Sequence, residues 1–393
     1  MTVPSPPHAP GREYEVTPLE LFFDLVFVFA VSQLSHHLLT HLSWRGTIET
    51  LVLLRAVYGV WYATSWVATM VPAEEPRSRR MVLTVMLLSL FMNASVTGAF
   101  TTSGWAFVIP LVLIQVGRTG WTVVNAADPV FRDHFSRALF WFVAMSPVWV
   151  AGAAANPETR LLWWALAAGI DQVGAWLAHP LPGRWLHTEN VDFAGGHMLE
   201  RCRLFLIIAL GETVLTTCTA IAAAPMTPMT VLTGTAALAG TVALWALAFG
   251  RAGRLILRHV GETQDPVRAS HHSVSVLMAM VAGLIAVAVA NEMAIAHPHG
   301  HPSAALSLLL FGGPVLFLVA LGWYLWAVPR VRPRPRVIIG GAALVPVGFA
   351  ASAAPPYVAL VLAGATLATL AVLGGVAGPR GQNRGAFHDG RPP

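Results

Sequence analysis

The chain contains no lysine and carries little charge of either sign. Charged residues make up 11% of the 393 residues, apolar residues make up 55%, and the mean hydropathy is +0.63. A soluble protein of this length needs roughly 25% charged residues to cover its surface. The shortage of polar side chains therefore excludes a water-soluble fold and indicates an integral membrane protein.

Cysteine is also scarce, and the two that occur cannot pair along one helix. Cys202 and Cys218 lie in a single apolar segment, where helical geometry separates them by about 24 Å, far beyond the span of a disulfide. The H-E-x-x-H, G-x-S-x-G, P-loop and G-x-G-x-x-G motifs are absent, as is a mid-membrane histidine pair for haem. We therefore predict no cofactor and no soluble catalytic domain. The arginines are not clustered with aromatics on a polar face, so no nucleic-acid partner is expected.

Long apolar runs recur along the chain with short polar breaks between them. Each has roughly the 17–25 residues that a helix needs to cross a bilayer, and helix satisfies the backbone within lipid. The predicted spans are 19–41, 49–71, 81–100, 105–126, 137–155, 161–178, 200–222, 229–250, 273–296, 304–327, 337–353 and 356–377. The sequence thus predicts an all-α polytopic membrane protein with about twelve transmembrane helices.

Arginine placement predicts the orientation of these helices. A cytoplasmic N-terminus puts 20 of the 24 arginines at cytoplasmic segments and leaves Arg45 and Arg160 outside, with Arg55 and Arg118 within spans. This asymmetry follows the positive-inside rule. The N-terminal MTVPSPPHAPGREYEVTP has no apolar run of the kind found in a cleaved signal peptide. We expect a multi-pass plasma-membrane protein with both termini in the cytoplasm.

A weak internal repeat divides the predicted helices into two sets of six. Leu19-Glu20 opens the first helix and Leu199-Glu200 the seventh, and acid-Pro-Arg clusters precede the third and ninth. Parallel repeats are common among transporters, although chance similarity between apolar segments explains the pattern equally well. The corresponding segments are a cytoplasmic tail 1–17, a first six-helix half 18–178, a cytoplasmic linker 179–198, a second half 199–378 and a cytoplasmic tail 379–393.

Several ionisable and amide side chains fall within the predicted spans. An isolated charge at the bilayer centre costs roughly 3 kcal/mol or more, so such groups pair, face water or become neutral. Glu20 suits the N-terminus of the first helix, whereas Asp24 lies a turn deeper on the same face. Arg118 is the predicted counter-charge, and Gly211 is expected to let another backbone approach. The predicted ion or proton pathway consists of Asp24, Asp171, Glu212, Arg118, Glu20, Asn93 and Glu292.

Histidines gather at the predicted outer side of the membrane. His37 and His41 are spaced i, i+4, and His297, His299 and His301 alternate in HPHGHP. Such residues are candidate ligands for zinc or copper. Because His-x-His runs in loops are usually unliganded, no metal site is predicted.

With these residues identified, the chain resembles the bacterial low-temperature-requirement A family, LtrA. The resemblance rests on ELFFDLVFVFAVSQLSHHL at 20–38 and ERCRLFLIIALGETVL at 200–215, and extends over most of 14–378. Cys202-Arg203 stands where the family usually has Phe-Gly or similar, so the polarity differs there. The family is named for growth in the cold, so the resemblance implies a membrane protein without a defined activity. The Phe22-Phe23-Asp24 opening is also similar, over a few residues, to the Phe-Ser-Asp opening of tandem six-helix potassium channels.

These observations favour a transporter or channel-like protein that moves an ion, a proton or a small solute through the lipid bilayer. A membrane enzyme acting on a lipid-soluble substrate, with a carboxylate and outer histidines as acid and base, is one alternative. A structural or cold-adaptation protein, in which buried salt bridges only hold the bundle, is another. Acids grouped around a polar cavity would favour transport. A lateral opening beside Glu292 and His37 would favour an enzyme, and a core in which every charge is paired would favour a structural role. The oligomeric state is left open.

Overall fold

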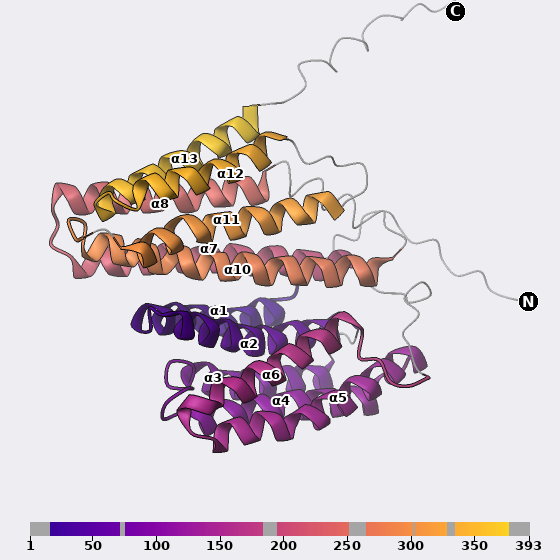
Figure 1. Ribbon diagram of the computed structural model, residues 1–393. Coiled ribbons are helices and arrows are strands. Elements are labelled where there is room, and N and C mark those ends of the chain that lie inside the picture. Colours follow the sequence, from indigo (N-terminus) through magenta and orange to yellow (C-terminus); the bar gives the residue numbers. More distant parts are fainter. Residues whose placement is uncertain are drawn as a thin grey trace, which may run out of the picture.

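The computed structural model describes residues 16–70, 75–183, 195–250, 265–301, 303–327 and 335–376. These residues form twelve helices, labelled in Figure 1, and each overlaps one of the predicted apolar runs. Their bounds are α1 Pro18–Thr40, α2 Trp44–Met70, α3 Pro76–Ala94, α4 Gly104–Asn125, α5 Pro129–Ala154, α6 Pro157–Trp176, α7 Gly195–Ala223, α8 Pro228–Phe249, α10 Pro266–Ala296, α11 Ala304–Ala327, α12 Pro335–Ala351 and α13 Pro356–Val376. The prediction of an all-α protein is confirmed.

Nine helices of the described residues are long and apolar enough to cross a membrane. They are α1, α2, α4, α5, α7, α8, α10, α11 and α13. Of the other three, α3 begins with an arginine-rich turn, α6 contains Arg160 and Asp171, and α12 has 17 residues. The chain is therefore a multi-pass membrane protein by the length and composition of its helices.

The start of α1 is fixed by a capping box. The Thr17 hydroxyl accepts a hydrogen bond from the Glu20 backbone N–H at 3.3 Å, and the Glu20 carboxylate accepts one from the Thr17 N–H at 2.9 Å. Pro18 occupies the first turn, where its missing N–H is not needed. Glu20 is thus held at the helix N-terminus, as its position in the sequence predicted.

The two faces of α1 differ in a way that suits a helix at the edge of a membrane bundle. Phe22 and Leu25 are 57% and 53% exposed, whereas Phe23 and Asp24 are 1% and 0% exposed. Large apolar side chains exposed on one face match a lipid surround. The carboxylate of Asp24 faces the protein interior rather than lipid.

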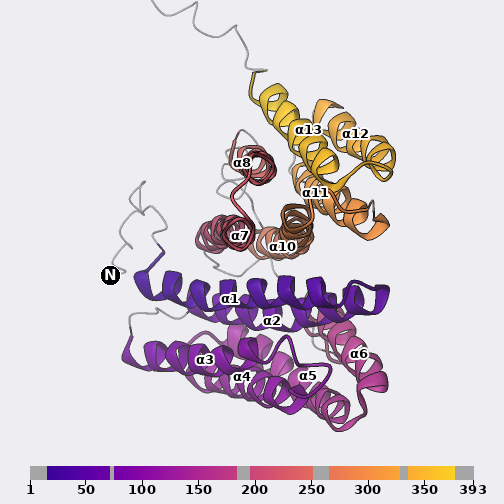
Figure 2. The same ribbon diagram turned by 90° about the vertical axis from the view of Figure 1, so that its left-hand side faces the viewer.

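The helices gather in two groups. Figures 1 and 2 show α1–α6 on one side and α7–α13 on the other, with α1 and α2 lying against α7 and α10 between them. The buried apolar side chains form one continuous cluster that includes residues of both groups. The contact between the groups therefore forms the middle of the molecule.

The α10–α11 pair packs most closely at glycine. A Cβ added at Gly283 would lie 2.7 Å from the backbone oxygen of Gly313, and one added at Gly313 would lie 2.8 Å from the oxygen of Gly283. Small residues allow such close backbone approach between membrane helices. Gly211 on α7, where the sequence suggested a similar contact, has nothing within 4 Å of an added Cβ, so that expectation was wrong.

Candidate charged site between helices α1 and α7

Asp24 forms a buried ion pair with an arginine from the opposite helix group. Arg201 Nη2 donates to Asp24 Oδ1 at 2.6 Å, and Trp61 Nε1 on α2 donates to the same oxygen at 2.7 Å. Asp24 is fully buried and Arg201 is 1% exposed. Charge-assisted hydrogen bonds of this length are among the stronger interactions in proteins. Asp24 therefore joins α1, α2 and α7 at one point.

Glu20 extends this contact one turn toward the helix start. Its Oε1 lies 3.6 Å from Arg201 Nη1, and its Oε2 lies 3.3 Å from His197 Nε2. We call Glu20, Asp24, His197 and Arg201 the α1–α7 charge cluster. Two carboxylates thus share one guanidinium, and His197 lies beside the outer carboxylate.

Aromatic rings cover the α1–α7 charge cluster. The Arg201 guanidinium lies 5.5 Å from the centre of the Phe23 ring, within the range of a cation–π contact. The Trp61 and Phe205 rings lie 4.5 Å apart, and Tyr58 lies 5.1 Å from Trp61. Excluding water lowers the local dielectric constant and strengthens the charge interactions inside. Glu20, Asp24 and Arg201 are closed to solvent in this structure, whereas the His197 side chain is 15% exposed.

Hydrogen bonding within the cluster is incomplete. Among the described residues, Asp24 Oδ2, Glu20 Oε1 and Arg201 Nε are buried and have no hydrogen-bond partner. Buried polar atoms in native proteins are nearly always satisfied, so each exception needs an explanation. The unused carboxylate oxygens can accept a proton, a cation or a water molecule.

Glu212 lies farther along the same pair of helices. It is 8% exposed, and its carboxyl is within hydrogen-bonding reach of Ser32 on α1. The contacts of Glu20 with His197, Asp24 with Arg201, and Ser32 with Glu212 follow the same order on both helices. Helices α1 and α7 therefore run parallel, with acids at two levels of their shared surface.

Arg118 does not pair with any of the predicted acids. Its guanidinium donates to the backbone oxygen of Val60 and to the hydroxyls of Thr64 and Thr119, and lies 5.8 Å from the Phe142 ring. The expectation that Arg118 supplies the counter-charge is therefore wrong in this structure. Arg201 supplies it for Asp24.

The remaining predicted pathway residues lie elsewhere. Asp171 on α6 accepts from Trp149 Nε1 at 3.1 Å, and Asn93 on α3 donates to the backbone oxygen of Val26 at 2.9 Å. Glu292 on α10 is partly exposed and lies near His36 on α1. The structure thus brings together Glu20 and Asp24, places Glu212 on the same helix pair, and keeps the other residues apart from them.

The outer histidines are engaged in local contacts. His37 Nε2 lies 3.4 Å from Glu49, its Nδ1 lies 3.3 Å from the backbone oxygen of Thr97, and its ring stacks on His41 at 4.5 Å. His299 packs edge-on against Tyr357. In the part of the chain that the structure describes, no three His, Cys, Asp or Glu side chains are grouped so as to hold a metal ion.

Sequence reasoning missed the partners of Asp24. Arg201, Trp61 and His197 are not among the predicted pathway residues. The signal was the repeat itself, because Leu19-Glu20 and Leu199-Glu200 are 180 residues apart and Asp24 and Arg201 are 177 apart. Two parallel helices aligned at nearly the repeat spacing bring these residues side by side.

Comparison with known proteins bears on the family of the chain. The family model for the bacterial low temperature requirement A protein matches residues 15–372. An uncharacterized protein of Rhizobium meliloti (strain 1021) is 30% identical over 323 residues, which cover 81% of this chain and 79% of that protein. No solved structure matches. The chain belongs to the bacterial low temperature requirement A family.

Proposed function

We propose that the protein moves an ion, a proton or a small solute across the plasma membrane, with the α1–α7 charge cluster as the central element of the pathway. The observation that carries the proposal is the fully buried Asp24, which has one oxygen bonded to Arg201 and Trp61 and the other without a partner. An ion pair that served only to hold two helices would gain from having every acceptor satisfied. A free acceptor inside the bundle suits a group that exchanges partners.

The charge balance of the cluster supports this proposal. Two carboxylates face one guanidinium, so a bound cation or proton offsets the surplus negative charge. Ionisable residues within membrane helices commonly mark ion pathways and proton relays. Burial of the cluster corresponds to a closed state, and transport requires α1 and α7 to separate at this level.

The packing of the two helix groups supports a tandem arrangement of halves 18–178 and 199–378. In the first group α1 packs on α2 and α3, α3 to α6 pack in sequence, and α2 contacts α6. In the second group α7 packs on α8 and α10, α10 to α13 pack in sequence, and α8 contacts α13. Recurrence of one neighbour pattern is what two copies of a six-helix unit produce, and transporters bind their cargo between such units.

Parallel packing of α1 and α7 also agrees with a twelve-span topology. If both helices start on the same side of the membrane, the chain crosses it an even number of times from α1 to α6. We propose that α1 to α6 make six crossings and that both termini are cytoplasmic, in agreement with the arginine asymmetry.

The test is flux of protons, Na⁺ and K⁺ into liposomes containing the purified protein. We expect wild type to conduct at least one of these ions, and Asp24→Asn to remove the flux while it keeps wild-type yield and thermal stability. Glu158→Gln, which changes an exposed acid in the first turn of α6, is the matched control and should behave as wild type.

Two results would contradict the proposal. One is flux in Asp24→Asn equal to that of wild type. The other is a wild-type protein that is folded and inert toward all cargoes tested, with Asp24→Asn lowering only its stability. The second result would assign the cluster a structural role.

A further inference from the structure

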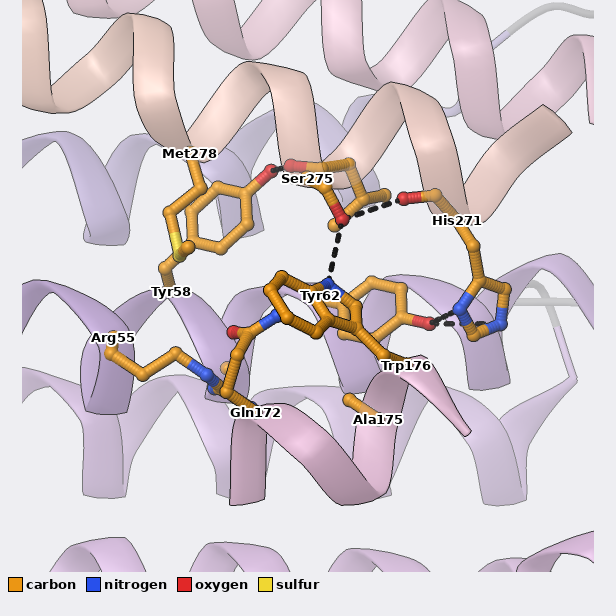
Figure 3. Close-up of a pocket in the computed structure, with 11 residues that line it drawn as sticks. Arg55, Tyr58, Tyr62, Gln172, Ala175, Trp176, His271, Ser275 and Met278 are labelled. Carbon is orange, nitrogen blue, oxygen red and sulfur yellow. Dashed lines mark hydrogen bonds between the residues drawn. The ribbon is translucent and has the colours of Figure 1, made fainter. Parts of the chain in front are cut away.

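Apart from the α1–α7 charge cluster, the described residues form a narrow pocket whose polar lining side chains include several hydrogen-bond donors and no acid (Figure 3). It lies between α2, α6 and α10, and Arg55, Gln172 and His271 come from these three helices respectively. Its free volume suits a single occupant about the size of a water molecule. The pocket therefore joins the two helix groups through polar side chains.

Arg55 is the charged residue of this pocket. Its Nε is closed off from solvent and has no hydrogen-bond partner among the described residues. Asp171 attracts the guanidinium from beyond ion-pair distance, and the Asp171 carboxylate is bonded instead to Trp149. Arg55 is half-buried, and a guanidinium partly removed from water without a close counter-charge is costly, so an occupant that supplies negative charge would be stabilised there.

The other lining side chains differ in whether their hydrogen-bond donors already have a partner. The Tyr58 hydroxyl donates to the backbone oxygen of Val274, and the Tyr62 hydroxyl lies 3.2 Å from His271 Nε2. Figure 3 shows the Arg55 side chain extending toward Gln172, with Tyr62 and His271 on the far side of the pocket. The guanidinium and the Gln172 amide are thus the two groups with donors to offer an occupant.

We propose that this pocket binds a small monovalent anion of halide size. A guanidinium beside an amide donor recognises an anion, and the lack of an acidic lining residue disfavours a cation. The small volume disfavours phosphate, sulfate and lipid head groups. None of the carboxylates of the α1–α7 charge cluster lines this pocket. Anion binding can therefore be tested independently of the transport activity.

The experiment measures thermal unfolding of the purified full-length protein while chloride replaces gluconate at constant ionic strength. We expect a saturable rise in Tm with chloride and with bromide, because a ligand that binds only the folded state stabilises it. Arg55→Gln should remove the dependence. Arg160→Gln is the matched control, since Arg160 is a buried guanidinium whose three nitrogens each donate to a backbone oxygen, and it should keep the dependence.

A second variant covers the case in which Arg55→Gln does not fold. Gln172→Leu removes one donor and leaves the charge, so the chloride concentration at half-maximal shift should rise several-fold. A chloride response that is absent in wild type, unchanged in both pocket variants, or equalled by sulfate would overturn the proposal.

Discussion

At the scale of single residues, Arg201 makes several different contacts within the α1–α7 charge cluster. This side chain is 1% exposed, pairs with Asp24 and Glu20, and packs over the Phe23 ring. Arginine suits the position because its planar guanidinium presents several donors in fixed directions and stays charged at physiological pH. A lysine ammonium could pair with one carboxylate but could not donate to both in the planar geometry of a guanidinium.

Removing Arg201 should therefore destabilise the protein more than removing Asp24. Arg201→Gln leaves two buried carboxylates without their cation, and breaking one partner of a buried pair costs about 3–5 kcal/mol. Asp24→Asn leaves Arg201 with Glu20. We expect the double variant Arg201→Gln with Asp24→Asn to unfold at a higher temperature than Arg201→Gln alone, as measured by tryptophan fluorescence. If the two changes were simply additive, the carboxylates and the guanidinium would not be coupled.

Glu212 provides a second prediction at this scale. Its carboxyl lies beside Ser32 on α1, farther along the shared surface than Asp24. In the proposed mechanism, this carboxyl exchanges a proton when the two helices separate. Glu212→Gln should leave the fold intact and remove the pH dependence of flux. The measurement is flux against pH for wild type, Glu212→Gln and the exposed control Glu158→Gln. Identical profiles for all three would make Glu212 a packing residue.

At the scale of helices, close packing depends on a few glycines. At Gly283 an added Cβ would lie 2.7 Å from the backbone oxygen of Gly313 and 3.1 Å from the backbone nitrogen of Phe317. Backbone atoms cannot move aside as the end of a flexible side chain can, so the two helices would have to shift.

Gly283→Ala should accordingly destabilise the protein by about 1–3 kcal/mol, the usual cost of overpacking. Gly211→Ala is the control, because an added Cβ there meets nothing within 4 Å and alanine favours helix over glycine by roughly 0.5–1 kcal/mol. Thermal unfolding of both variants in the same detergent distinguishes the two effects. Equal midpoints would mean that α10 and α11 do not approach as closely as described.

The helices themselves could be predicted well from the sequence, and their partners could not. Apolar length and the need to satisfy backbone groups in lipid determine where helices form, so the twelve predicted runs overlap the twelve observed helices. Which faces meet depends on side-chain packing between segments far apart in the chain. Asp24 was recognised as a site residue from its position in one helix, whereas its pairing with Arg201 required the α1–α7 alignment. Arg118, at mid-membrane depth, was assigned the wrong partner for the same reason.

At the scale of the whole molecule, the two arginines that the predicted topology places outside, Arg45 and Arg160, make local bonds. Arg45 pairs with Glu49 at 2.8 Å and donates to the backbone oxygen of Pro157. Arg160 donates to backbone oxygens at the end of α5 and in the turn after α3, including those of Ala99 and Gly152. These two exceptions to the predicted charge asymmetry therefore have a structural use.

The predicted topology leads to a direct test. Reporters fused to either terminus should report a cytoplasmic location, and a reporter at Gly300, in the turn between α10 and α11, should report an external one. Accessibility of the same positions to a membrane-impermeant label in intact cells is an independent readout. A cytoplasmic Gly300 together with cytoplasmic termini would contradict the twelve-span topology.

The long separation between Asp24 and Arg201 has a consequence for how the protein is made. The two residues are 177 positions apart, and a ribosome that adds about 5–20 residues per second needs roughly 10–35 s to synthesise that interval. For this time α1 holds Glu20 and Asp24 in the membrane before their guanidinium exists. Nascent chains that stop before α7 carry these acids without their cation, so insertion of α7 completes the first half as well as beginning the second.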